Sequence, residues 1–317
     1  MTRLLLALLF AFAASAASAQ GYPSKPVRFV VPFQPAGPAD IVARLLGQRL
    51  SEAWGHQIVV ENRPGAGGNV GAVVAARSAP DGYTVMVTSS AVVVNVTLSS
   101  RPGYDLDKDF IPVINVASSP NVIAASSEWG AKTLREAIAR AKSEKVAYGS
   151  PGAGTTPHLS AEYLFRVLSK TDIMHVPYKG GAPAAAAAAA GEVQLVSSAL
   201  PAMMPFIRSG RIKPLAVTST QRLAALPDVP TVEEAGYPGF ADYTWIGVFV
   251  PAGTPANIVS RLHDDIDKAL MQADFRERIA AAGFDAVGGT QQGFVQYVRE
   301  EVTRWGKIVR ATGAQVD

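Results

Sequence analysis

The sequence predicts an α/β protein, and three observations support that prediction. Apolar, β-branched runs alternate with stretches of helical periodicity along the chain after Gly21. Two loops rich in Gly, Pro, Ser and Thr, at 32–40 and 149–158, each follow such a run and precede a predicted helix. The 317-residue chain has no cysteine, and it is long enough to bury a core without disulfides. Regular strand–helix alternation is typical of parallel sheets with helices on both faces.

Strand–helix units fill the first part of the chain. The expected strands are Val27–Val31, Ile58–Val60 and Tyr83–Val87. Apolar residues at three- and four-residue spacing predict a helix that ends near Trp54, and a shorter helix ends near Ser78. Three hydroxyl residues follow the third strand and can cap the next helix: Thr88, Ser89 and Ser90.

The middle of the chain repeats this order. The expected strands are 146–148, 173–177, 193–196 and 215–217. The expected helices are 134–141, 159–168 and 184–190. The last helix is an alanine run, a strong helix former that begins after Pro183 and ends at Gly191.

Two breaks, near 118–120 and 237–239, bound a compact α/β segment. After the second break, 245–250 is apolar enough for a central strand, and two C-terminal helices are expected at 256–272 and 292–311. If the segment is inserted into a host domain, two lobes are joined by two crossings of the chain. Two sequential domains fit the pattern almost as well.

The N-terminus resembles a secretory signal peptide. Arg3 precedes an apolar run, 4–14, and the small residues of 17–19 form a cleavage site before Gln20. The run is short for a membrane span, which needs about 20 residues. A buried N-terminal helix is the alternative. We expect residues 1–19 to be removed and the mature protein to be exported.

Composition and motifs exclude several functions. The formal net charge of +3 is spread along the chain without a basic run, so nucleic acid is not an expected partner. The sequence has no G-x-S-x-G, H-E-x-x-H or Walker motif, and its four histidines are scattered. We therefore expect no metal, no cofactor and no catalysis. The glycine-rich stretch 65–71 departs from dinucleotide-binding spacing and predicts a structural turn.

The loop at 32–40 predicts part of an anion site. It links a strand to a helix, and free N–H groups and the helix dipole favour negative charge at a helix N-terminus. Ligands of open α/β sheets bind outside the carboxyl ends of strands. A plain tight turn is the alternative. The candidate residues are Phe33, Gln34, Pro35, Ala36, Gly37 and Asp40, of which Asp40 is expected to cap or brace the loop.

The second loop predicts the other part of the site. Glycines 152 and 154 let the backbone approach a ligand, and two threonines add hydroxyl groups. The candidates here are Ser150, Gly152, Ala153, Gly154, Thr155, Thr156 and His158. His158 is also explained as a core or helix-surface histidine. A third helix start adds Tyr178, Lys179, Gly180 and Gly181, where Lys179 either adds positive charge or is only solvated. Two such loops, far apart in sequence, suggest two lobes that share one ligand.

Motifs along the whole mature chain resemble the Bug receptors, the extracytoplasmic solute-binding proteins of tripartite tricarboxylate transporters. The matching segments are 22–28, 32–40, 60–71, 79–84, 177–180, 226–231 and 251–255. They occur in the order typical of the family, and together they are specific.

The resemblance implies a periplasmic-binding-protein fold of type II-like architecture, with two Rossmann-like lobes and a two-crossing hinge. Lobe 1 would comprise 20–119 plus 243–317, and lobe 2 would comprise 120–242. The lobes would close over a small carboxylate, with Ser89 and Ser90 added to the contacts of lobe 1. The implied protein is a periplasmic monomer without a cofactor, and its partners are a small organic anion and the membrane subunits of a tripartite tricarboxylate transporter.

Two departures from the family pattern matter. Ala36 and Pro38 stand where glycine is usual, which implies a stiffer first loop. Gln194 stands where Asp is usual, which favours a ligand without an amine. Two other functions stay open: an exported serine hydrolase with Ser150 or Ser89 as nucleophile, and a ligand-sensing receptor that contacts a signalling protein.

Overall fold

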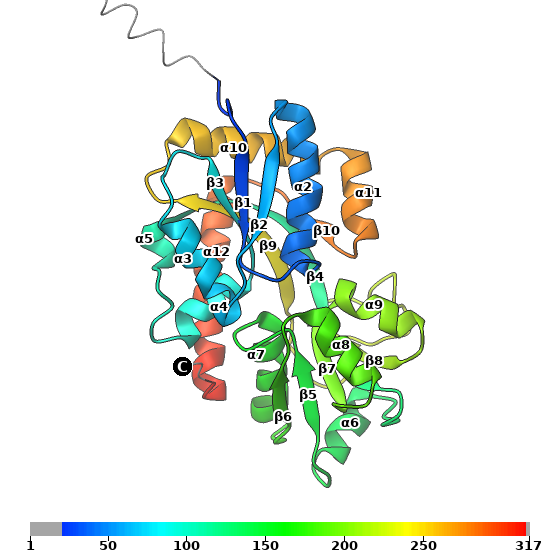
Figure 1. The fold of residues 1–317 in the computed structure, drawn as a ribbon. Coiled ribbons are helices and arrows are strands. Elements are labelled where there is room, and N and C mark those ends of the chain that lie inside the picture. Colours follow the sequence, from blue (N-terminus) through cyan, green and yellow to red (C-terminus); the bar gives the residue numbers. More distant parts are fainter. Residues whose placement is uncertain (1–20, 315–317) are drawn as a thin grey trace, which may run out of the picture.

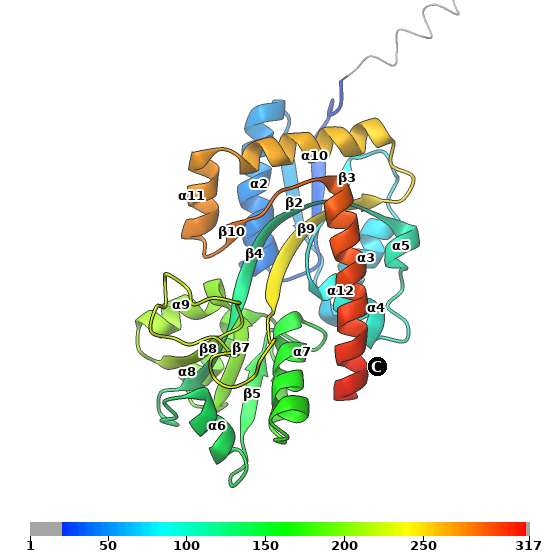
Figure 2. The same ribbon diagram turned by 180° about the vertical axis from the view of Figure 1, so that it is seen from behind.

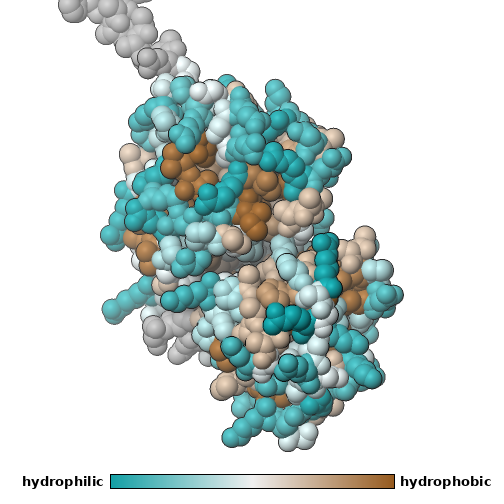
Figure 3. All heavy atoms as spheres, turned by 45° about the vertical axis from the view of Figure 1, so that its right-hand side comes forward, coloured by the Kyte–Doolittle hydropathy of each residue, from teal (hydrophilic) through white to brown (hydrophobic). Residues whose placement is uncertain are grey.

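A computed structural model describes residues 21–314, and the predicted leader at 1–19 lies outside the described residues. Two α/β lobes lie end to end, and strands β4 and β9 run between them (Figure 1). The predicted fold class is confirmed. Figure 3 shows that the molecule narrows between the lobes, and that apolar residues on this face form separate patches among hydrophilic ones.

The first lobe has a mixed sheet. Strands β1 (Val27–Val31), β2 (Ile58–Asn62) and β3 (Thr84–Ser89) are parallel, whereas β9 (Tyr243–Pro251) is antiparallel to β3. The first part of β4 (Phe110–Ser126) pairs with β9, and β10 (Asp285–Ala286) pairs with β4, both antiparallel. The helices of this lobe are α2 (Pro38–Trp54), η2 (Ala66–Gly68), α3 (Asn69–Ala76), α4 (Ala91–Leu98), α5 (Leu106–Asp109), α10 (Ala256–Leu270), α11 (Ala273–Ala281) and α12 (Gln291–Thr312).

The second lobe is built on the remainder of β4. Strands β7 (Leu195–Ala199) and β8 (Ile212–Val217) pair with it antiparallel, while β5 (Ala147–Ser150) runs parallel to β7 and to β6 (Met174–Pro177). The helices are α6 (Leu134–Arg140), α7 (Thr156–Glu162), which continues as the π-helical turn η3 (Tyr163–Leu168), α8 (Gly181–Ala189) and α9 (Leu200–Arg208).

Apolar side chains cover both faces of each sheet. In α10, Val259, Leu262 and Ile266 recur at helical spacing and are all buried, which contributes about 2 kcal/mol per side chain. On the other face of the first sheet, Trp245 and Trp305 are fully buried. The C-terminal helix α12 thus belongs to the first lobe, and it extends along the back of the molecule beside α7 and η3 (Figure 2).

Three expectations about the elements were wrong. The sheets are mixed rather than parallel, because β4 and β9 run antiparallel to their neighbours. The boundary expected near 118–120 does not interrupt the chain with a loop, since β4 continues to Ser126 and Pro120 lies where the strand leaves β9 for β7 and β8. Proline has no N–H to donate, so it fits this change of partner. A third C-terminal helix, α11, follows α10 directly after Gln272.

The packing of α3 against the loops that follow β1 and β2 predicts the effect of one substitution. A Cβ on Gly71 would lie 2.7 Å from both Pro32 Cα and Arg63 O. We expect Gly71→Ala to lower the free energy of unfolding by about 1–3 kcal/mol, since backbone atoms cannot move aside cheaply. Gly306→Ala in α12 is the matched control, because its nearest neighbour would be 3.5 Å away. That change should be neutral or stabilising. Equal urea midpoints for the two variants would contradict this account.

Candidate functional site

The strand directions place the candidate loops at the junction between the lobes. Strands β1 and β3 run antiparallel to β9, and therefore in the direction of β4, toward the second lobe. Strands β5 and β6 run parallel to β7, and therefore against β4, toward the first lobe. The carboxyl ends of both sets consequently face each other. Helices α2, α4, α7 and α8 begin directly after these four strands (Figure 1).

The loop before α2 is held by a buried carboxylate. Asp40 is 2% exposed, and it accepts hydrogen bonds from Ala36 N at 2.8 Å, Arg44 Nε at 2.9 Å and Asn62 Nδ2 at 2.9 Å. Burial alone raises the pKa of Asp40, but the hydrogen bonds from Arg44, Ala36 and Asn62 outweigh it, so this pKa lies below its ordinary value. The carboxylate therefore braces the loop.

Ala36 itself adopts a conformation that favours glycine. Its φ is 62°, in the left-handed region, which costs a non-glycine residue about 1 kcal/mol. The bond from Ala36 N to Asp40 holds this conformation. Alanine has fewer backbone conformations available than glycine, so its presence here agrees with the stiffer loop that the sequence predicts.

The loop after β5 is held by two histidines. Ser150 Oγ lies 2.7 Å from His175 Nε2 and accepts from Gly152 N at 3.2 Å, and Gly154 N donates to His158 Nδ1 at 3.3 Å. The imidazole rings of His158 and His175 stack with centroids 3.9 Å apart. Ser150 is fully buried, so its hydroxyl is turned into the loop.

Both histidines are neutral at pH 7. Burial, together with the neighbouring His175, lowers the pKa of His158 to about 3. Burial lowers the pKa of His175 to about 4. Neither ring can supply a positive charge to an anion near neutral pH, and the His158 Nδ1 atom stays an acceptor for the Gly154 amide.

The lobes touch through the loop at 152–156. Ser90 Oγ lies 3.0 Å from Thr156 Oγ1, which lies 3.1 Å from Thr244 Oγ1. A Cβ on Gly154 would lie 2.3 Å from Asn95 Oδ1, and one on Gly67 would lie 2.9 Å from Ala153 O. Gly67 thus lets the backbones of the two lobes approach each other, and Gly154 leaves room for the side chain of Asn95.

The other candidate residues lie on the same loops or beside them. Tyr178 N donates to Ser150 O at 3.0 Å, so the loop at 178–181 packs against the loop at 150–152. Lys179 is exposed, and Gly181 packs against Ser198 Oγ at the end of β7. In the first lobe, Phe33 packs against the glycine-rich turn at Gly68.

Sequence reasoning missed two parts of this junction. The turn at 65–68 was expected to be structural only, yet it contacts both Phe33 and Ala153. Asn95 was not singled out, although it donates to Gly67 O at 2.8 Å and faces Gly154. The dense glycines of 65–71 were the available signal for close backbone approach; a lone Asn in an apolar helix offered none.

The interpretation of Gln194 was wrong. Gln194 lies at the amino end of β7, where Ala147 N donates to its Oε1 at 3.0 Å. The candidate loops follow the carboxyl ends of β5 and β6, which run parallel to β7, and therefore lie at the opposite end of the lobe. The identity of residue 194 therefore carries no information about a ligand amine.

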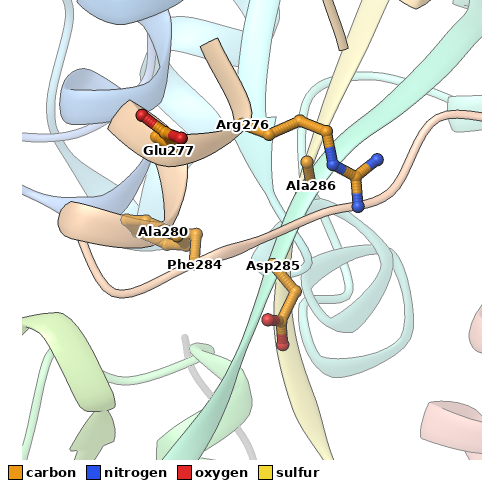
Figure 4. A pocket seen from close by; sticks show the side chains of 6 residues that line it. All are labelled: Arg276, Glu277, Ala280, Phe284, Asp285 and Ala286. Carbon is orange, nitrogen blue, oxygen red and sulfur yellow. The ribbon is translucent and has the colours of Figure 1, made fainter. Parts of the chain in front are cut away.

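Two hollows lie elsewhere on the first lobe. One, of about 250 Å³, is lined by residues of α11 and β10 that include Arg276 and Asp285 (Figure 4). The other, of about 350 Å³, shares Arg276 and includes His263. None of the sequence-predicted site residues lines either hollow. Within residues 21–314, no group of three or more His, Asp or Glu side chains is arranged to hold a metal ion.

Two α/β lobes with helix N-termini that face each other across a two-strand hinge define a two-lobed solute-binding protein. A model of the tripartite tricarboxylate transporter family receptor matches residues 42–314, so the chain belongs to that family. The resemblance drawn from the sequence motifs is thereby confirmed.

Solved structures of relatives agree with this assignment. R. palustris Rpa4515 with adipate is 35% identical to this chain, has a TM-score of 0.88, and covers 93% of this chain and all of its own. MatC from Rhodopseudomonas palustris with bound malate is 34% identical, has a TM-score of 0.85, and covers 91% of this chain and all of its own. The periplasmic binding protein BugD is 31% identical, has a TM-score of 0.85, and covers 93% of this chain and 99% of its own.

The family is thus one of periplasmic receptors that bind solutes. Among residues 21–314, no helix combines the length and the apolar character needed to cross a bilayer.

The histidine pair predicts loss of stability in acid. In the unfolded chain, His175 binds a proton near pH 6.5, whereas burial holds its pKa at about 4 in the folded protein. Because the unfolded state binds the proton more readily, the free energy of unfolding falls as the pH drops from about 6.5 to 4. At about 1.36 kcal/mol per pKa unit, His175 alone accounts for up to about 3 kcal/mol. Urea denaturation at pH 7, 5.5 and 4.5 should show a shallower pH slope for His175→Gln. His56→Gln is the control. If the pH slope of His175→Gln is as steep as that of the wild type, His175 does not cause the loss of stability in acid.

Proposed function

We propose that this protein is a periplasmic receptor that captures a small organic carboxylate between its two lobes and delivers it to a tripartite tricarboxylate transporter. The observation that carries the proposal is the meeting of helix N-termini from both lobes at one junction, in a chain whose relatives were solved with adipate and with malate. Backbone N–H groups at those N-termini are suited to bind carboxylate oxygens.

The electrostatics of the junction favour an anion held by dipoles. Lys179 is the one basic residue among the candidate contacts, and it is exposed. Asp40 is occupied by its own loop, and the neutral histidines add no charge. Binding energy therefore comes from preorganised N–H groups, hydroxyl groups and lobe closure, in place of ion pairs.

We assign the ligand contacts to the loops at the ends of four strands. Lobe 1, taken as 20–119 plus 243–317, would contribute 33–37 and Ser89–Ser90; lobe 2, taken as 120–242, would contribute 152–156 and 178–181. The pairing of β4 with strands of both lobes supports these bounds. Ser150, His158 and Asp40, whose polar atoms are bonded within their own loops, would position those loops, and Ser90 and Thr156 are buried against each other between the lobes.

We infer that the protein performs no chemistry on its ligand. The one arrangement that favours a hydrolase is the Ser150–His175 contact at 2.7 Å. However, Ser150 is fully buried, and its hydroxyl already bonds to Gly152. A serine-reactive fluorophosphonate probe should therefore leave the folded protein unlabelled, and labelling that disappears in Ser150→Ala would contradict this inference.

The delivery of the ligand implies further properties of the mature protein. We propose that residues 1–19 are a cleaved signal peptide, that the mature chain acts as a monomer, and that its liganded form contacts the membrane subunits of the transporter. A ligand-dependent pull-down of those subunits tests the last point, and retention of a sensor protein in their place would favour a signalling role.

A carboxylate should stabilise the folded protein. At one hundred times its dissociation constant, a ligand raises the free energy of unfolding by about 2.7 kcal/mol, which thermal denaturation resolves easily. The panel should include adipate, malate, tricarboxylates, aromatic carboxylates and acidic amino acids, with the corresponding amides as controls. A ligand-free, folded sample that responds to no carboxylate would overturn the proposed function.

A pair of glycine variants separates ligand binding from loop strain. Gly154→Ala places a Cβ 2.3 Å from Asn95 Oδ1, whereas Gly130→Ala, with a similar φ of 82° against 78°, has no atom within 4 Å. Both changes should cost about 1 kcal/mol of stability because of the positive φ. Only Gly154→Ala should abolish the thermal shift with a carboxylate. If the thermal shift in Gly154→Ala equals that of the wild type, the contact between Gly154 and Asn95 plays no part in lobe closure.

A further inference from the structure

Two buried carboxylates and a partly exposed arginine form a cluster that includes none of the candidate ligand contacts. Asp242, which directly precedes β9, is 2% exposed, and Glu301 in α12 is 5% exposed. Arg304, also in α12, donates from Nε to Glu301 Oε1 at 2.7 Å and from Nη2 to Asp242 Oδ1 at 3.4 Å. Its Nη1 donates to Ala241 O at 3.1 Å.

The carboxylate of Asp242 joins three separate elements. Its Oδ2 accepts from Asn121 Nδ2 in β4 at 2.6 Å and from Ser160 Oγ in α7, while its Oδ1 accepts from Arg304 in α12. A buried carboxylate is tolerated only when its oxygens are occupied by donors. The contacts therefore connect one hinge crossing, a helix of the second lobe and a helix of the first lobe.

Glu301 fixes the other end of this connection. Its Oε2 accepts from the indole Nε1 atoms of Trp245 at 3.0 Å and Trp305 at 3.2 Å, both fully buried. The glutamate is thus locked into the core of the first lobe. Arg304 is held by Glu301 and reaches from there to the chain crossing at 241–242.

The cluster is linked to the ligand loop through one face of α7. Ser160, which donates to Asp242, is one helical turn after Thr156, and Thr156 contacts both Ser90 and Thr244. Thr156 directly follows the loop at 150–155. A change in the bond between Arg304 and Asp242 would therefore be transmitted to the position of this loop against the first lobe.

We propose that Arg304 is a positioning residue that latches the two lobes together through Asp242 and so sets the equilibrium between open and closed receptor. The arrangement described here, in which Gly154 meets Asn95 and Gly67 meets Ala153, is the latched one. Loss of the latch favours the open form. The ligand then dissociates faster, although no ligand contact has changed.

The test compares three substitutions in the full chain. Arg304→Gln removes the charge and the fork of donors, and Arg304→Lys keeps the charge but loses the fork. Arg299→Gln, an exposed arginine of the same helix, is the matched control. Because the sequence has no cysteine, spin labels at Glu52→Cys in α2 and Ala186→Cys in α8, both exposed, report the distance between the lobes without interference.

We expect Arg304→Gln to lengthen and broaden the inter-label distance in the ligand-free protein, and to raise the dissociation rate of adipate about tenfold. Arg304→Lys should lie between that variant and the wild type, while Arg299→Gln should match the wild type. If Arg304→Gln lowers only the urea midpoint and leaves both the distance and the dissociation rate unchanged, Arg304 is a structural brace and the proposal is wrong.

The dissociation measurement rests on the proposed function, whereas the ligand-free distance does not. If adipate and the other carboxylates fail to bind the wild type, the proposed function falls, and the distance between the labels still decides the latch. Ser160→Ala is a second test that changes no charge. It removes the hydrogen bond from α7 to Asp242 and leaves Arg304 and Glu301 in place, so it should also lengthen the inter-label distance. Wild-type inter-label distances in both Ser160→Ala and Arg304→Gln would overturn the latch.

Discussion

Strand β4 is the constraint on which the rest of the structure depends. Its 17 residues pair with β9 in the first lobe and then with β7 and β8 in the second. Where a strand changes partners, some backbone groups lose their ladder bonds and need other partners. Asn121 N accordingly donates to Thr218 Oγ1 at 2.9 Å. The polar hinge is thus a consequence of one strand serving two sheets, and the same strand fixes the directions that bring the candidate loops face to face.

Charge is distributed unequally between the hinge and the candidate site. The buried carboxylates Asp242 and Glu301 share Arg304 behind the junction, whereas the loops in front present amides, hydroxyl groups and neutral imidazoles. Ionised side chains near an anion site would either repel the ligand or hold it by ion pairs that are costly to desolvate. In the receptor that we propose, the charges at the hinge set the lobe position, while dipoles of the loops recognise the ligand.

The sequence predicted the local elements well and their partners poorly. Val27–Val31 and the helix that ends at Trp54 follow from β-branched runs and helical periodicity, which are local properties. Strand β4 was not predicted at all: Pro120 and its serine neighbours resemble a break, and only the change of partner explains them. Gln194 was misplaced for a related reason: a motif gives a position along the chain, but the strand direction decides which end of the lobe it occupies.

The close approaches at Gly67 and Gly154 could not be predicted, because they depend on residues that have no side chain. Gly67 and Gly154 are informative only once Ala153 and Asn95 are known to lie opposite them. A junction formed by backbone against backbone constrains glycine positions strongly and leaves the surrounding side chains free to vary. Such a junction is consistent with one fold, shared at about a third sequence identity, in structures that hold ligands as different in length as adipate and malate. Ligand choice in this chain should therefore follow from loop shape, as set by Ala36 and Asp40 on one side and the histidine pair on the other, more than from any single contacting side chain.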